Sequence, residues 1–323
     1  MYKRQAATSA YSPVTLNKLA DFIIDHPENY VIVGLPCFLK ALRNYFSKVA
    51  GLSVDKHPIL LGIICGHLKS KLYGHMLSQQ IGIERNSIRH INYREKIPGA
   101  AANEKGFKVT YSDKNIAKSK AEIVQNLFGT DYGFGFFKYK ACDYCDDVFA
   151  EVADASFGDA WLPEYLEESH SLVVSRSAKI SKLFSEFADK KLVRTSVLDA
   201  SRAVQAQNAG LRHRREGLSY RLYLDAIKGK WAPKKRVIAS QSTLTNRQKI
   251  IQRMRIWVRE RAPSDYLEAA EKNDYTSFYR RYVRTWRIYR AVYGSLRYFP
   301  VRLVFAYFGQ DIDAIVRRIF NVR

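Results

Sequence analysis

The chain has 323 residues, of which 47% are hydrophobic, and a formal net charge of +22 at pH 7. That apolar share is ordinary for globular proteins, so a large core can be buried. No run of about eighteen uncharged apolar residues and no signal-peptide run occurs, so the sequence predicts a cytoplasmic protein without a transmembrane helix.

The charge is concentrated near the C-terminus. Residues 201–323 hold 27 Lys and Arg residues against 9 Asp and Glu residues, whereas the first 200 residues are nearly neutral. This asymmetry indicates an anionic partner such as a membrane surface, nucleic acid or another polyanion. We therefore expect a body over residues 7–200 and a basic extension over residues 201–323. Residues 1–6 are expected to be a sequencing-adapter artefact or a disordered start.

Strand and helix signals alternate along the body. Helical spacing of apolar residues predicts helices at residues 16–24, 38–46 and 70–81. Short apolar or β-branched runs predict strands at residues 30–33, 59–64, 88–93, 106–111, 156–157 and 172–174. This alternation predicts an α/β fold, in which the strands form one mixed, largely buried sheet between flanking helices.

From about Ala200 the pattern changes to amphipathic helical segments. Strand-like runs nearly vanish, and Pro233, Pro263 and Pro300 are expected to interrupt the helices. The basic extension is therefore predicted to be mostly helical.

The chain has four cysteines, Cys37, Cys65, Cys142 and Cys145. Cys37 and Cys65 each follow a predicted strand directly, and ligands bind at the carboxyl ends of strands in open α/β sheets. The C-x-x-C pair, Cys142 and Cys145, is by itself compatible with zinc, redox chemistry or a turn. Together the four thiolates could complete the sulfur shell of a 4Fe-4S cluster or of a closed structural zinc site. A reducing compartment disfavours structural disulfides.

Five short motifs follow one another in a characteristic order. They are Gly34-Leu-Pro-Cys37, Cys65-Gly-His67, residues 92–96, Cys142-x-x-Cys145 with residues 153–161, and residues 171–176. In these motifs the chain resembles the coenzyme F420 hydrogenase/dehydrogenase beta subunit family over roughly residues 7–190. Each motif alone is weak evidence for this resemblance. Five motifs in this order, which together include every cysteine, are specific.

The resemblance implies an iron–sulfur protein, usually with a flavin, that relays electrons between a 4Fe-4S cluster, FAD and a redox partner protein or small-molecule acceptor. It assigns the cluster to the four cysteines. The family's preceding N-terminal region, which contacts the flavin, is missing from this sequence, so we expect a truncated start and weak binding of FAD. Many bacterial members lie near polysaccharide-synthesis genes, which suggests that context.

Four further residues are candidates for the site. Arg94 and Lys96 could hold a flavin phosphate or an anionic substrate, because fixed cations stabilise such charge; the alternative is a solvated strand end. Asp159 could bond a cofactor ring or ribose, or cap the turn after Gly158. His67, the candidate catalytic residue, could orient a cysteine or assist proton transfer, or only bond the backbone at a turn.

One predicted helical face in the extension is aromatic. Its members recur every three or four residues, which places them on one side of a helix: Phe278, Tyr282, Trp286, Tyr289, Tyr293 and Leu296. One interpretation is an interfacial helix on anionic lipid. The other is a helix docked on the body with its cationic face in solvent. Nucleic acid is disfavoured, because no recognised binding module appears.

We therefore predict an oxidoreductase that passes electrons through a 4Fe-4S cluster and is cytoplasmic or peripheral at the inner face of the membrane. The alternative is a non-enzymatic, membrane-surface assembly protein of polysaccharide synthesis or export, with a structural zinc or a vestigial cluster site.

Overall fold

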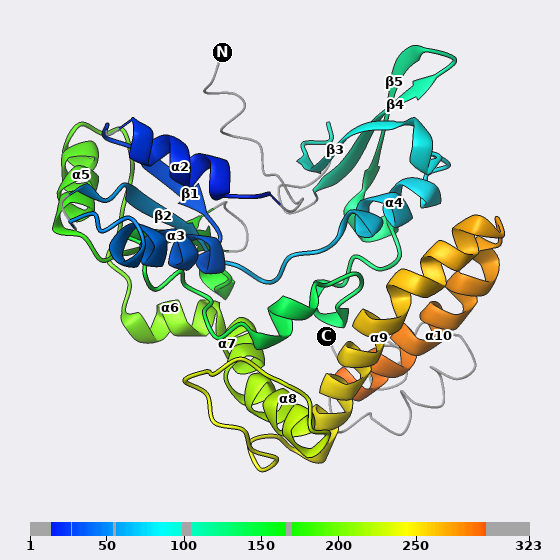
Figure 1. The fold of residues 1–323 in the computed structure, drawn as a ribbon. Helices are drawn as coiled ribbons and strands as arrows, with labels where there is room; N and C mark the ends of the chain where they lie inside the picture. Colours follow the sequence, from blue (N-terminus) through cyan, green and yellow to red (C-terminus); the bar gives the residue numbers. More distant parts are fainter. Residues whose placement is uncertain (1–13, 27, 54–55, 99–104, 166–169, 295–323) are drawn as a thin grey trace.

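The structure, a computed structural model, describes residues 14–26, 28–53, 56–98, 105–165 and 170–294. Its four-stranded sheet has the order β1 (Val31–Gly34), β2 (Ile59–Ile63), β6 (Ala155–Asp159) and β7 (Ser171–Ser175). The first three strands are parallel and β7 is antiparallel to β6. A separate antiparallel sheet has the order β3 (Ile88–Glu95), β4 (Gly106–Asp113) and β5 (Ile116–Ile123). The predicted α/β class with a mixed sheet is confirmed (Figure 1).

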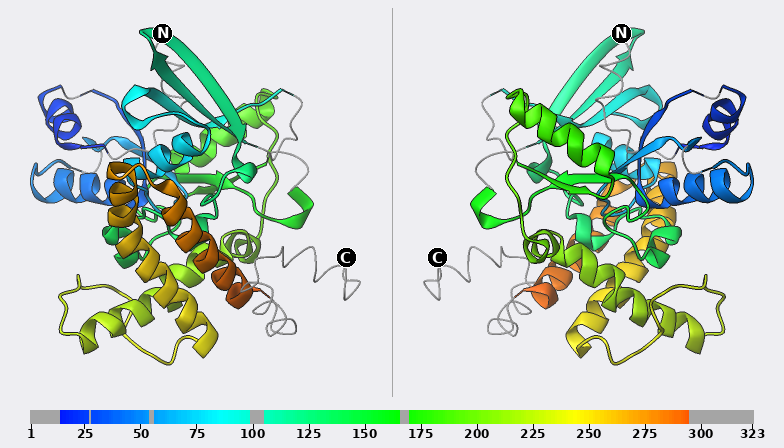
Figure 2. Two further views of the ribbon diagram at one scale, coloured as in Figure 1. Left: turned by 90° about the vertical axis from the view of Figure 1, so that its right-hand side faces the viewer. Right: turned by 90° about the vertical axis from the view of Figure 1, so that its left-hand side faces the viewer.

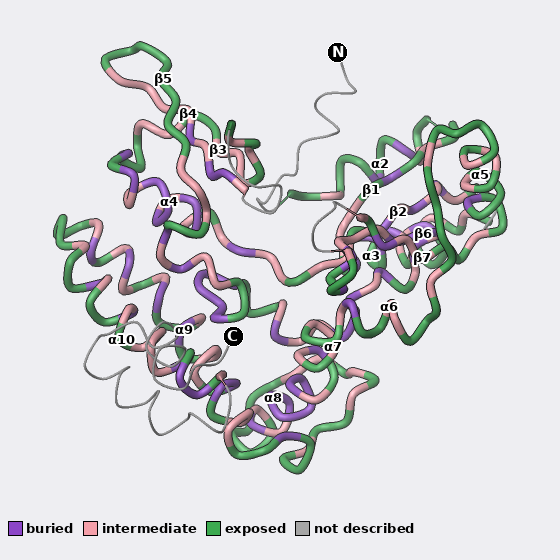
Figure 3. The backbone as a smooth tube through the Cα atoms, turned by 180° about the vertical axis from the view of Figure 1, so that it is seen from behind, coloured by how far each residue is buried: buried purple, intermediate pink, exposed green. Residues whose placement is uncertain are grey.

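The prediction of one continuous sheet is wrong, because β3 and β4 do not join the four-stranded sheet. A two-residue turn connects β4 to β5, and both of its residues, Lys114 and Asn115, have positive φ angles of 47° and 65°. Such turns match the twist of a hairpin, so each strand pairs with its neighbour in the chain. The strand β5 was not predicted, since its side chains are mostly exposed and polar. Figure 3 shows this hairpin extending from the body.

Helices cover the four-stranded sheet on both faces. On one face α2 (Asn17–Asp25) and α3 (Pro36–Lys48) bury an aliphatic core that includes Ile23, Leu39 and Leu60. On the other, Phe184 of α5 (Ala178–Asp189) meets Phe157 of β6, with ring centroids 6.3 Å apart. The helices predicted at residues 16–24 and 38–46 are thus confirmed, and their apolar periodicity marks the buried side.

A second core is mostly aromatic and lies outside the four-stranded sheet. It is built from α4 (Lys71–Gln80), the small sheet, the segment 127–137, α9 (Asn246–Glu271) and α10 (Tyr275–Tyr293). The two views in Figure 2 show α9 and α10 side by side. This core therefore joins residues from both sides of position 200.

The extension is helical, as predicted. It begins with three shorter helices, α6 (Ala200–Ala206), α7 (Asn208–Arg214) and α8 (Glu216–Ile227). Short 3-10 turns lie elsewhere in the chain: η2 (Arg85–Ser87), η3 (Val124–Asn126), η4 (Tyr132–Phe134), η5 (Lys140–Tyr144) and η6 (Pro163–Tyr165).

The expected helix break at Pro263 is wrong, because α9 runs through that proline. Pro263 lacks an N–H and ordinarily interrupts the hydrogen-bond ladder of a helix. Here Val258, Ala262 and Tyr266 on both sides of it are buried in the aromatic core, so packing holds the helix together. Pro233 lies in a non-helical segment after α8, as expected, and Pro300 lies outside the described residues.

The aromatic face of α10 points into the protein. Phe278, Tyr282 and Tyr289 are buried in the aromatic core, and Trp286 packs against it. Tyr293 at the helix end is 49% exposed, and Leu296 lies outside the described residues. In the structure this face is therefore that of a docked helix. Among the described residues, no helix is both long and apolar enough to cross a membrane.

Candidate functional site

The four cysteines come from two strand ends and one loop. Cys37 is the second residue of α3, directly after β1, and Cys65 follows the end of β2. Since β1 and β2 are parallel, both cysteines lie at the same edge of the sheet, as the sequence predicted. Cys142 lies in η5 and Cys145 is its C-terminal capping residue.

The four thiols lie near one another. Burial, together with the charges of Cys142, Cys145 and Cys37, raises the pKa of Cys65 to about 12 against the opposing effect of Arg214. Burial also raises the pKa of Cys37, and the charges of Cys145 and Cys142 add to that effect. Cys37 and Cys65 therefore both respond to the charges of Cys142 and Cys145, although the cysteines are up to 108 positions apart in the sequence. A metal group bound here would have to displace their protons.

Four cysteine thiols are the sulfur donors that this region offers to a metal group. Among the described residues, no three His, Cys, Asp or Glu side chains lie close enough together to hold one metal ion. The backbone N–H of Leu68 donates to the Cys142 Sγ at 3.4 Å, the kind of contact that tunes cluster thiolates.

A buried carboxylate, Asp143, lies inside the C-x-x-C pair and receives three cations. Lys138 forms an ion pair with it, and the Arg259 Nε lies 2.8 Å from its Oδ2, without the alignment of a hydrogen bond. The Arg221 Nε donates to its main-chain oxygen at 2.9 Å. Burial alone would raise the pKa of Asp143, but the charges of Lys138, Arg221 and Arg259 together lower it below its usual value.

Arginines of the extension also hold the neighbouring loops. The buried Arg214 of α7 donates to the main-chain oxygens of Cys65, at 2.5 Å, and Gly66. Arg236, which follows α8, donates to the main-chain oxygen of Asp146 at 2.6 Å. The basic extension thus contacts both cysteine-bearing loops. The sequence analysis did not predict these contacts. Asp143, an acidic residue inside the cysteine pair of a basic chain, was the signal that could have indicated them.

The structure brings together two of the three residues predicted to bind a cofactor. The Arg94 guanidinium, on β3, lies 3.7 Å from the Asp159 carboxylate at the end of β6. Lys105, which sequence reasoning did not select, lies 3.9 Å from the other oxygen of Asp159. Lys96 follows β3 and is exposed, and no contact of its side chain is recorded within the described chain. The two sheets therefore meet at a small, mostly basic cluster.

His67 lies at the edge of a cavity beside Cys65. Its ring stacks on Tyr132 with centroids 4.0 Å apart, and its main-chain oxygen accepts a hydrogen bond from the Tyr132 hydroxyl. Burial, followed by the charges of Lys69 and Lys138, holds the pKa of His67 well below its usual range. Its buried Nε2 has no hydrogen-bond partner among the described residues. The stacked ring of His67 therefore faces the cavity with one nitrogen unpartnered within the described residues.

A comparison with known proteins places these features in a family. The family model for the C-terminal part of the beta subunit of coenzyme F420 hydrogenase/dehydrogenase matches residues 27–201, more than half of the chain. No curated protein matches the sequence. Among solved structures, a chain of the xenon-derivatised F420-reducing hydrogenase complex from Methanosarcina barkeri is similar, with 14% identity and a TM-score of 0.45. The similarity covers 70% of this chain and 72% of that one. On the family match, the chain belongs to the coenzyme F420 hydrogenase/dehydrogenase beta subunit family.

Proposed function

We propose that the protein is an electron-transfer subunit in which Cys37, Cys65, Cys142 and Cys145 hold one 4Fe-4S cluster. The observation that carries the proposal is that Cys37 and Cys65 lie at the carboxyl edge of β1 and β2, beside the loop of Cys142 and Cys145: the Cys65 N–H donates to the Val148 oxygen and the Leu68 N–H to the Cys142 Sγ. Family membership supports the same chemistry. Such a cluster supplies one-electron transfer at a potential that depends on its surroundings.

The protein's own residues would tune that potential. Arg214 and Lys138 lie near enough to lower the pKa of Cys142 against the raising effect of its burial, so they favour the thiolate. Positive charge near a cluster also favours its reduced, more negative form. Cys37 is the exposed member of the set, so a redox partner is expected to approach on its side.

The test is anaerobic reconstitution followed by iron and sulfide analysis. We expect about four of each per chain, with the visible absorption of a cubane cluster. The variant Cys142→Ser should lose the cluster or hold it weakly. Stoichiometric zinc without sulfide would contradict the proposal and favour a structural site.

A flavin is the second group that we propose, near Arg94, Asp159, Lys96 and Lys105. The ion pairs Arg94–Asp159 and Lys105–Asp159 join the two sheets, and their cations could receive a flavin phosphate. We expect the present chain to bind FAD weakly. A titration of the chain with FAD, followed by flavin fluorescence, tests this, and Arg94→Gln should weaken the binding further. Tight, stoichiometric binding would contradict the expectation of weak affinity.

A further inference from the structure

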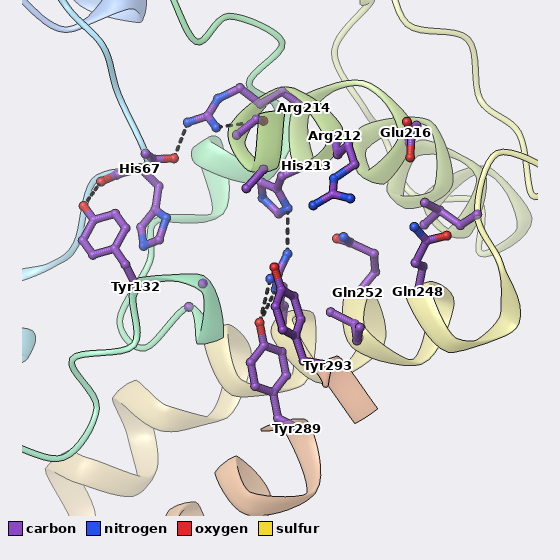
Figure 4. Close-up of a pocket in the computed structure, with 18 of the residues that line it drawn as sticks. His67, Tyr132, Arg212, His213, Arg214, Glu216, Gln248, Gln252, Tyr289 and Tyr293 are labelled. Atoms are coloured by element: carbon purple, nitrogen blue, oxygen red, sulfur yellow. Dashed lines mark hydrogen bonds between the residues drawn. The ribbon is translucent and has the colours of Figure 1, made fainter. Parts of the chain in front are cut away.

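A large cavity lies beside the cysteine loops, and the extension forms most of it. Its volume is about 790 Å³, within the range of small-molecule sites. Figure 4 shows His67 and Tyr132 at one end, with side chains of α7, α9 and α10 around the rest. Most of the lining residues follow position 201, where the family match ends. Most of the cavity wall therefore lies outside the part of the chain that the family model matches.

The cavity concentrates positive charge that the protein does not neutralise. Four arginines line it: Arg212, Arg214, Arg247 and Arg255. None of them forms an ion pair with a carboxylate within the part of the chain that the structure describes. Of the acids in the described part of the chain, two line the cavity, and one of them, Asp131, caps η4 through the Phe134 N–H. Uncompensated cations at a partly enclosed site attract an anion.

Two of these arginines are held in position before any ligand arrives. The Arg255 Nη2 donates to the Tyr289 hydroxyl at 2.6 Å, and its Nη1 lies 3.3 Å from the His213 Nδ1. Arg247 donates to main-chain oxygens at the end of α10, including that of Tyr293 at 2.6 Å. Fixing such side chains in advance lowers the entropic cost of binding. Arg212 is exposed and makes no recorded hydrogen bond within the described chain, so its guanidinium is available to a ligand.

The polar groups around the arginines are arranged as donors. The His213 Nδ1 faces the guanidinium of Arg255, which has only donors, so the ring hydrogen lies on Nε2. Burial, followed by the charges of Arg221, Lys138 and Arg255, lowers the pKa of His213 well below its usual range and keeps the ring neutral. The buried Nε of Arg214 has no hydrogen-bond partner among the described residues. The cavity thus offers donors and few acceptors, which suits an anion.

The cavity also has an aromatic and apolar wall. Tyr289 and Tyr293 stack with centroids 5.7 Å apart, and the Arg255 guanidinium lies 5.6 Å and 5.8 Å from their ring centres. Leu244 and Ile251 add apolar surface. A bare ion would leave this wall and most of the volume unused. The shape and the aromatic wall therefore favour an anion with an organic part, and a flat organic part would fit best.

We propose that this cavity binds a small organic phosphate, whose phosphate group meets Arg212, Arg247 and Arg255 and whose body lies against Tyr289 and Tyr293. A phosphate presents three acceptor oxygens and up to two negative charges, and so matches several guanidinium groups better than a carboxylate does. The proposal goes beyond electron transfer and does not depend on the cluster, since no cysteine lines the cavity.

The experiment is isothermal titration calorimetry of the full chain with adenosine monophosphate, adenosine, inorganic phosphate and citrate. Adenosine monophosphate should bind at least tenfold more tightly than adenosine or inorganic phosphate, and its binding should weaken with salt. Equal binding of adenosine and its phosphate would overturn the anion site. If inorganic phosphate bound as tightly as adenosine monophosphate, the proposed contact of an organic body with the tyrosines would be wrong. If citrate bound more tightly than adenosine monophosphate, the choice of a phosphate group would be wrong.

The matched variants are Arg212→Gln in the cavity and Arg261→Gln on the exposed side of α9, which remove the same charge. Arg212→Gln should weaken the binding of adenosine monophosphate about tenfold or more, with an unchanged melting temperature, because it removes a charged donor. Arg261→Gln should leave the affinity unchanged. Equal effects of the two variants would show a general charge effect and would overturn the site. The same titrations on cluster-free protein separate this result from any failure of the electron-transfer proposal.

Discussion

The two cores of the molecule are assembled in different ways. Among the residues that the structure describes, the buried members of the aliphatic core under α2 and α3 lie between positions 20 and 153, within or next to the family match. The aromatic core combines residues 73–137 with residues 251–292 of the extension. A basic C-terminal segment that the sequence suggests is an appendage is therefore part of the fold. Net charge describes the surface of a segment, whereas burial of its apolar side decides whether it packs.

The largest effect should come from emptying the aromatic core. Tyr282 is fully buried, and its ring centroid lies 4.7 Å from that of Phe278. Its hydroxyl donates a hydrogen bond to the Asp265 carboxylate at 2.8 Å. Tyr282→Ala should lower the free energy of unfolding by about 3–5 kcal/mol. Urea denaturation measures this, and the exposed Arg280→Ala on the same helix is the control. A loss below about 1 kcal/mol would mean that α10 is loosely attached and free to meet a lipid surface.

A somewhat smaller effect should follow from removing the charge of Asp143. Asp143→Asn leaves Lys138, Arg221 and Arg259 without their buried counter-ion and should lower the free energy of unfolding by about 3 kcal/mol. Asp113→Asn, which breaks an ion pair on the β5 hairpin, should cost about 1 kcal/mol or less. Equal losses in the two variants would contradict a special role for the buried cluster.

The same carboxylate sets a direction for acid sensitivity. The folded protein lowers the pKa of Asp143 below the ordinary 3.8, so its stabilisation is complete above that pH and disappears as the pH falls through the lower value. The difference in stability between wild type and Asp143→Asn should therefore shrink below about pH 4. A constant difference down to pH 2 would argue against this ionisation.

A third, smaller effect should appear in alkaline solution. Lys69 is buried and donates to the Phe136 main-chain oxygen at 2.9 Å, and burial lowers its pKa from 10.5 to about 7. Between pH 7 and 9 the unfolded chain binds the proton and the folded chain does not, so stability should rise with pH. The rise is at most about 1.4 kcal/mol per pH unit. Chemical denaturation at several pH values measures it, and Lys69→Met should flatten the curve. A Lys69→Met curve as steep as that of wild type would assign the rise to another group.

The smallest effect should come from Pro263. Pro263→Ala restores a backbone donor inside α9 and removes the clash of the ring with the preceding turn. The gain is partly cancelled because the alanine chain has more freedom when unfolded. We expect the free energy of unfolding to rise by about 1 kcal/mol, measured as a shift in the urea midpoint. A loss of stability would show that the proline fits a bend on which the packing of α9 depends.

Local patterns predicted much of the fold and the position of the cysteines. The apolar runs at β1 and β2 predicted the two strands, and their parallel pairing brings Cys37 and Cys65 to one edge. The independent sheet was not predictable in the same way, since the polar strand β5 has no apolar alternation. The helix through Pro263 was missed because tertiary packing outweighs local propensity there.

The surroundings of the cysteines depend on contacts that no local pattern contains. Arg214 reaches Cys65 across 149 positions, and Arg221 reaches Asp143 across 78. In the sequence these arginines look like any others in a basic segment. The cavity is hidden for the same reason, because its walls come from the loop after β2, the segment around η4 and four helices of the extension.

The reach of these arginines has a consequence for the order of events during synthesis. The N-terminal part of a chain emerges first, and contacts between distant residues form late because long loops must close. Both cysteine loops would therefore take their final positions only after Arg214, Arg221 and Arg259 have been synthesised. The final placement of the four cysteines is therefore expected to follow the synthesis of at least α9, and a chain interrupted before α9 would present its thiols without the cations that accompany them in the full chain.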